Sequence, residues 1–177
     1  MDRIRWFFIV GLFFVAGNAA ASGFSTALEG MDGQKTSLSE YVGKGKWVLF
    51  NVWGPKCPPC LEEISELTAF HEDHKGTDAI VVSMALDFPS FGYAKKGQVE
   101  EFIEDFFVTY PVLLGDAGLS ERVTGRPLRG TPSSYLYDPQ GRLVVVQVGS
   151  VTQDLIERLI TLNEGSKQRT LTYQSGK

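Results

Sequence analysis

The stretch that decides the fold is WVLFNVWGPKCPPC, residues 47–60. Its first half, residues 47–52, is a nearly continuous apolar run, which is the pattern of a strand buried on both faces of a sheet. Its second half brings Cys57 and Cys60, the only two cysteines of the chain, directly after that strand. From residue 58 to about 74, apolar residues recur at helical spacing. The stretch therefore predicts a buried strand that leads through a cysteine pair into a helix.

Strands and helices alternate on both sides of this unit. After it we expect, in order, strand 79–86, an aromatic loop at 87–97, helix 98–108, strand 111–114, helix 117–123, a hairpin of strands 133–137 and 143–148, and a final helix over 152–163. Before it we expect strands 24–28 and 34–36 around a glycine turn and a brief capped helical turn at 37–41. This order predicts an α/β domain with a mixed central sheet, helices on both faces and an N-terminal β-hairpin extension. The aromatic loop either lines a substrate groove or packs its own rings onto the domain.

The N-terminus carries an export signature. Arg3 and Arg5 precede the apolar run of residues 6–16, and small residues follow it. This order is that of a secretory signal peptide, and the run is shorter than the roughly 20 residues of a spanning helix. We expect residues 1–21 to be a signal peptide or an uncleaved membrane anchor, residues 22–164 to form the domain in the periplasm or elsewhere outside the cytoplasm, and residues 165–177 to be a polar, frayed tail.

The composition is that of one ordinary globular domain. The chain has 177 residues, of which 43% are hydrophobic, and a formal net charge of −4. No basic surface is implied, so nucleic acid is not expected as a partner.

The cysteine spacing favours redox chemistry over a structural role. A bond between Cys57 and Cys60 closes a very small loop and stabilises the fold by only about 2 kcal/mol, against more than about 4 for a loop of 100 residues. Cys57 is expected at the helix N-cap, where free N–H groups and the helix dipole favour a thiolate, with Pro58 at the first helical position. Cys57 is then the exposed nucleophile and Cys60 the resolving thiol. Lys56 either stabilises that thiolate or is a solvated surface lysine. No cofactor is expected beyond the disulfide itself.

Residues 47–60 resemble the TlpA/ResA-like branch of the thioredoxin superfamily, in which an apolar strand ends in Asn-Phe-Trp before Trp-Cys-x-x-Cys. The resemblance extends from Phe24 to Asn163 and implies a thioredoxin-like fold. Residues 130–132, Gly-Thr-Pro, match the family's cis-proline loop. The resemblance implies that Pro132 is cis and that the Thr131 backbone pairs with the extended chain of a bound substrate. Lys56 departs from the family, which usually has Trp there, so the surface around the cysteines is more polar than is typical.

Glu63 matches a glutamate that ResA-like proteins keep near the dithiol. A carboxylate there would relay protons and raise the pKa of the thiols, which would keep the protein a reductant. Alternatively, Glu63 is an acid favoured by the helix dipole, along with Glu62. Asn51 occupies the place where cytoplasmic thioredoxins carry a buried aspartate, which leaves Glu63 as the acid of the site.

The resemblance implies a periplasmic protein-disulfide reductase that a membrane thiol carrier keeps reduced. Its expected clients are exported proteins with disulfides, apocytochrome c among them. A dithiol oxidase, a reductase for another client, and a structural disulfide module remain alternatives.

Two other classes of protein share the fold. A peroxiredoxin needs threonine three residues before its reactive cysteine, and Gly54 stands there relative to Cys57. A copper-delivery protein of the Sco type would need a C-x-x-x-C spacing and a distant histidine ligand. The only histidines, His71 and His74, fall at the polar end of the cysteine helix and are expected to be solvated. No metal site is therefore expected, and copper binding stays a second alternative on this fold.

Overall fold

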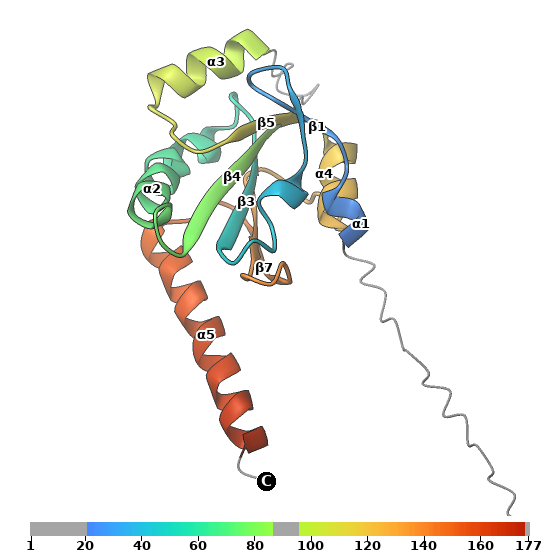
Figure 1. Cartoon of the computed structure of the whole chain (residues 1–177). Coiled ribbons are helices and arrows are strands. Elements are labelled where there is room, and N and C mark those ends of the chain that lie inside the picture. Colours follow the sequence, from blue (N-terminus) through green and yellow to red (C-terminus); the bar gives the residue numbers. More distant parts are fainter. Residues whose placement is uncertain (1–20, 87–95, 176–177) are drawn as a thin grey trace, which may run out of the picture.

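The computed structural model describes residues 21–86 and 96–175 (Figure 1). Nearly all of the expected signal peptide, residues 1–20, and most of the expected aromatic loop, residues 87–95, lie outside these ranges. Within the two ranges, no helix combines the length and the apolar character that crossing a bilayer requires.

Seven strands form one mixed sheet in the order β2-β1-β5-β4-β3-β6-β7. Their bounds are β1 Leu28–Gly30, β2 Lys35–Thr36, β3 Trp47–Trp53, β4 Ala79–Leu86, β5 Val112–Gly115, β6 Ser133–Tyr137 and β7 Leu143–Val148. Strand β3 runs parallel to β4, which runs parallel to β5, and the outer strands pair antiparallel. The predicted mixed sheet is confirmed, and β3, the strand that leads to the cysteines, lies inside it between β4 and β6.

Helices cover both faces of the sheet (Figure 1). They are α1 Ala21–Phe24, the 3-10 helix η1 Leu38–Glu40, α2 Pro58–His74, α3 Lys96–Asp105, α4 Ala117–Thr124 and α5 Gln153–Ser175. Two apolar clusters separate along β3 because successive side chains of a strand point to opposite faces. Trp47, Leu49 and Trp53 pack into the cluster with residues of α2, α3 and α5, whereas Val48, Phe50 and Val52 pack into the cluster on the α4 side. Asn51 shares the α2 face, and this places a polar group beneath the cysteine helix.

The N-terminal hairpin is present, but its first strand begins later than predicted. Strands β1 and β2 pair antiparallel around a turn in which Gly33 has a φ of 78°. The predicted strand at 24–28 is wrong for its first residues, because α1 ends at Phe24 and β1 begins at Leu28. The Phe24 ring packs edge-on against Tyr137 at 5.2 Å between centroids. This contact holds the segment against the domain without adding it to the sheet.

Two helices have other bounds than predicted. Helix α3 begins at Lys96 and ends at Asp105, before Phe107, whose positive φ of 53° does not continue a helix. Helix α5 runs on to Ser175, well past the predicted end at residue 163. Residues 164–175 hold no proline, and Gly165, their one glycine, weakens a helix without breaking it.

Candidate active site

The two cysteines form a disulfide in the first turn of α2, at the end of β3. Their Cα atoms are 5.3 Å apart, which is within the usual range for a disulfide. Cys57 is the N-cap of α2 and has extended backbone angles, and Pro58 and Pro59 occupy the first helical positions. The amide of Cys60 donates to the Cys57 carbonyl oxygen at 2.9 Å. The predicted placement of the pair is thus confirmed.

The expectation that Cys57 is exposed is wrong for this oxidised form. Cys57 is 3% exposed and Cys60 is 0% exposed. Both belong to the apolar cluster that includes Trp53 and Ile64. The disulfide holds the Cys57 sulfur against the first turn of α2, which accounts for its burial. The order of burial is as expected, because Cys60 is less exposed than Cys57.

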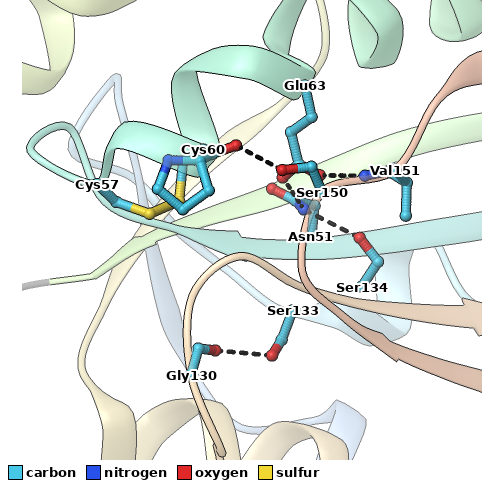
Figure 2. Close-up of a disulfide and its surroundings, with 10 residues drawn as sticks. Asn51, Cys57, Cys60, Glu63, Gly130, Ser133, Ser134, Ser150 and Val151 are labelled. Atoms are coloured by element: carbon cyan, nitrogen blue, oxygen red, sulfur yellow. Dashed lines mark hydrogen bonds between the residues drawn. A yellow bond between two sulfur atoms is a disulfide. The ribbon is translucent and has the colours of Figure 1, made fainter.

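The predicted cis peptide bond between Thr131 and Pro132 is confirmed. Ser133, the first residue of β6, pairs with Val52 of β3, so the cis-proline loop lies at the end of β3 that leads to Cys57. In Figure 2 the loop passes Gly130, whose carbonyl oxygen accepts a hydrogen bond from Ser133 Oγ at 2.7 Å. The loop and the dithiol therefore share one edge of the sheet.

Glu63 is buried beneath α2 and is not a solvated acid of its first turns. It is 1% exposed, whereas its neighbour Glu62 is exposed. Its Oε1 accepts a hydrogen bond from Asn51 Nδ2 at 2.8 Å, and its Oε2 accepts one from the Val151 amide at 2.9 Å (Figure 2). Burial raises the pKa of Glu63 to about 7, and these two hydrogen bonds offset only part of that rise. A carboxyl group with this pKa can give or take a proton near neutral pH.

The segment Gly149–Val151 joins the parts of the site and was not predicted from the sequence. The Gly149 amide donates to the Pro132 carbonyl oxygen at 2.9 Å, and Ser150 Oγ donates to the Pro59 carbonyl oxygen at 2.8 Å. The Val151 amide completes the set with its bond to Glu63. Three successive residues thus bind the cis-proline loop, the cysteine turn and the buried acid, and Figure 2 shows two of them, Ser150 and Val151, beside Glu63. No motif marks this segment, because its bonds come from backbone groups and one serine.

Asn51 is a second member of the site that the sequence left without a role in it. Its Nδ2 also donates to Ser134 Oγ at 3.0 Å, while its Oδ1 is buried without a hydrogen-bond partner among the described residues. Tyr110 adds a buried hydroxyl group that likewise lacks a partner there, and the charge of nearby Glu63 adds to the burial that raises the Tyr110 pKa. The acid thus lies in a pocket of mostly paired polar groups inside an apolar core.

The two predicted recognition residues lie at the surface of the site. Lys56 is exposed, and its side chain makes no hydrogen bond or ion pair with a described residue. Thr131 is half-buried beside the cis-proline bond. Both side chains are therefore at least partly open to solvent.

The histidines are not the solvated residues that we expected. His71 is only 6% exposed because it lies on the face of α2 that packs against β4, and its Nδ1 accepts a hydrogen bond from the Val81 amide at 3.1 Å. His74 is half-buried and contacts Asp78 and Glu157. In the part of the chain that the structure describes, no three His, Cys, Asp or Glu side chains come together as metal ligands.

Comparison with known proteins agrees with this geometry. Residues 17–146 match the AhpC/TSA family. The thiol–disulfide oxidoreductase ResA of Geobacillus kaustophilus is 32% identical over 152 residues, which are 82% of this chain and 80% of that protein. A DsbF homologue from Corynebacterium diphtheriae is 27% identical, with a TM-score of 0.64 over 76% of this chain and 82% of its own.

A third relative comes from Streptococcus pneumoniae. Its exposed lipoprotein thioredoxin Etrx1 is 26% identical, with a TM-score of 0.62 over 78% of this chain and 97% of its own. Each of these three proteins is matched over at least 80% of its own length. The chain therefore belongs to the AhpC/TSA family and is a thiol–disulfide oxidoreductase of the TlpA/ResA-like, thioredoxin-fold kind.

Proposed function

We propose that this protein reduces disulfides of exported client proteins through Cys57 and Cys60. The Cys57 thiolate attacks one sulfur of the client disulfide, and the other client sulfur leaves as a thiolate that takes up a proton. The Cys60 thiol then loses its proton and attacks the Cys57 sulfur of the mixed disulfide. The second client sulfur leaves as a thiolate and is protonated. The client disulfide has then gained two electrons, and Cys57 and Cys60 have been oxidised to a disulfide. The N-cap position of Cys57 and the deeper burial of Cys60 support these roles.

The observation that carries the direction of this exchange is the buried Glu63 carboxyl group, three residues after Cys60. An ionised carboxylate near the dithiol disfavours a thiolate, because like charges repel strongly at low dielectric. Strong dithiol oxidants work in the opposite way, since their reduced form is stabilised. With a pKa of about 7, Glu63 is also suited to accept the proton that Cys60 releases when it attacks. Reduction is therefore the favoured direction.

The cis-proline loop is the proposed docking place for the client. The Thr131 backbone, beside the cis bond and at the same sheet edge as Cys57, would pair with an extended client segment. Exposed Lys56 would face the same segment. Apocytochrome c, with its pair of cysteines, fits this kind of client, and a membrane thiol carrier would return the electrons.

We also propose that the protein works outside the cytoplasm. The export signature of residues 1–21 supports it, and the pneumococcal relative is named an exposed lipoprotein. Whether residues 1–21 are removed or retained as a tether decides only how close to the membrane the protein works.

The test combines a measurement of the reduction potential with two cysteine variants. We expect an equilibrium reduction potential near that of thioredoxin, roughly −270 mV, and a value near −120 mV would instead identify an oxidase. Cys60→Ser should accumulate mixed disulfides with client proteins, because nothing then displaces the client from Cys57. Cys57→Ser should neither trap clients nor reduce insulin. Full insulin reduction by Cys57→Ser would refute the assignment of the nucleophile.

A further inference from the structure

A second hollow lies at the end of the sheet opposite the dithiol. It is a cavity of about 790 Å³ between α1, α4, the segment before β3 and the turn between β6 and β7. Figure 1 shows α1 beside α4 on the side of the sheet away from α2. Residues 42–44, which line this cavity, precede the first residue of β3, whereas the last residue of β3, Trp53, precedes Cys57. The cavity and the dithiol therefore lie at opposite ends of β3. We call it the basic cavity because Lys44, Arg122, Arg126 and Arg142 line it.

The basic cavity has an excess of positive charge that the described residues do not neutralise. None of the described residues that line it is acidic. Arg142 Nε donates to the buried Asp138 carboxylate at 2.7 Å, so this cation is paired. The side chains of Lys44, Arg122 and Arg126 are exposed and form no ion pair or hydrogen bond with any residue of the described ranges. Three cations around one hollow, none paired with a described residue, in a chain whose net charge is −4, attract an anion.

The wall of the cavity holds a buried hydroxyl group that needs a partner. Tyr137 lines the cavity and is 1% exposed, and its hydroxyl has no hydrogen-bond partner among the described residues. Burial, and to a smaller extent the neighbouring Tyr135, raises the pKa of Tyr137, and the positive charge of Arg126, which lines the same cavity, partly counters that rise. A buried polar group without a partner is unfavourable, and a ligand oxygen would satisfy it.

The cavity also has an apolar side, formed by Phe24, Val42 and Leu143. Close backbone contact fixes this side: a Cβ added at Gly141, which has a φ of 81°, would lie 3.3 Å from Gly43 Cα. A small and rigid wall of this kind suits the uncharged part of a ligand. The volume is within the usual range of pockets for small molecules.

We propose that the basic cavity binds a phosphate group carried on an apolar molecule, with Arg122, Arg126 and Lys44 around the phosphate and Tyr137 donating its hydroxyl to it. Arginine forks match phosphate oxygens in pairs, and several cations together suit a phosphate better than a single carboxylate. The shared chemistry is a phosphate ester, which could be a phospholipid headgroup or a free phosphate compound. The cavity-lining residues Gly23 and Phe24 follow the predicted signal or anchor directly, so a retained anchor would bring lipid within reach.

Titration calorimetry at low ionic strength, about 0.05 M, tests this proposal, because salt screens such contacts. The two probes are inorganic phosphate and monomeric dihexanoyl phosphatidic acid. The double variant Arg122→Gln/Arg126→Gln should bind either probe about tenfold more weakly or worse. Tyr137→Phe should weaken binding several-fold while it keeps the fold, because the lost hydroxyl has no protein partner among the described residues. Arg129→Gln is the matched control, since Arg129 is an exposed arginine outside the cavity lining.

Tighter binding of the phosphatidic acid than of phosphate would support the proposal with lipid as the source, and equal binding would overturn it, because the apolar side of the cavity would then contribute nothing. No binding of either probe at millimolar concentration would overturn the proposal. An equal loss of binding in the Arg129→Gln control would also overturn it, because attraction would then be spread over the surface. Insulin reduction should be unchanged in all of these variants, so failure here is distinguishable from failure of the proposed reductase function.

Discussion

Replacing Glu63 by Gln should remove a pH dependence of stability that the native fold builds in. Burial raises the pKa of Glu63 from 4.5 to about 7. The folded state holds this proton more tightly than the unfolded chain does. The free energy of unfolding that the proton contributes is therefore fully present below pH 4.5 and is lost as pH rises through about 7. Linkage with these two values gives a loss of roughly 2 to 3 kcal/mol between pH 5 and pH 8, and almost nothing remains to be lost at higher pH. Gln is nearly isosteric and does not titrate, so it lacks this loss.

The hydrogen-bonding groups around residue 63 can accommodate the Glu63→Gln substitution. The carbonyl oxygen of the new side chain can accept from the Val151 amide in place of the carboxylate Oε2. Its amide group would then face Asn51, whose Oδ1 is free to accept if the Asn51 side chain turns over. Ser134 can accept from or donate to the turned side chain, because a hydroxyl group acts as donor or acceptor. The variant should therefore fold.

The assay is urea unfolding of the oxidised protein at pH 5 and pH 8, with wild type and Glu63→Gln measured side by side. Other titrating groups act on both proteins alike, so the difference between the two free energies of unfolding should shift by roughly 2 to 3 kcal/mol in favour of Glu63→Gln between the two pH values. Glu62→Gln, which alters the exposed neighbour, should show no such shift. If the difference between Glu63→Gln and wild type stays the same at both pH values, the carboxyl group is not held protonated by the fold and the reasoning fails.

Two further substitutions test the surroundings. Asn51→Asp puts a second carboxyl group at the 2.8 Å contact with Glu63, so the pair should keep one proton above pH 7, which carboxyl NMR titration can detect; two ionisations below pH 5 would contradict this. Asp138→Ala removes a fully buried carboxylate that accepts hydrogen bonds from the Gln140 amide and from the Arg142 amide and side chain. We expect it to cost about 2–4 kcal/mol of unfolding free energy in urea, with a loss below about 1 kcal/mol counting against that estimate.

Local spacing was enough to predict the dithiol and its helix. A continuous apolar strand, two cysteines three residues apart and a proline at the first helical position all lie within residues 47–60, and the structure has each of them in place. The cis bond before Pro132 could not come from local chemistry, because most X–Pro bonds are trans, and it was predicted through the family resemblance alone.

The contacts that surround Glu63 and Asn51 could not be predicted from the sequence. Ser134 reaches the Glu63–Asn51 pair because β6 pairs with β3, and Val151 reaches it because β7, which pairs with β6, ends at the same edge of the sheet as β3. His71 was misplaced for a similar reason. The sequence marks it as the polar end of a helix, whereas the packing of α2 on β4 makes its ring a buried partner of a backbone amide.

The burial of Glu63 follows from the same periodicity that buries Cys60. Residues three apart lie on one side of a helix, so Cys57, Cys60 and Glu63 succeed one another along the side of α2 that faces β3, and Ile64 and Leu67 continue it. A helix that carries the resolving thiol under the surface must therefore carry residue 63 under it as well. An apolar residue there would only add to the core, whereas a carboxyl group with a pKa of about 7 makes the surroundings of Cys60 change charge within the working range of pH. Thiolate formation at Cys60 and ionisation at Glu63 then oppose each other, so the reducing power of the dithiol should depend on pH more steeply than the thiols alone would make it.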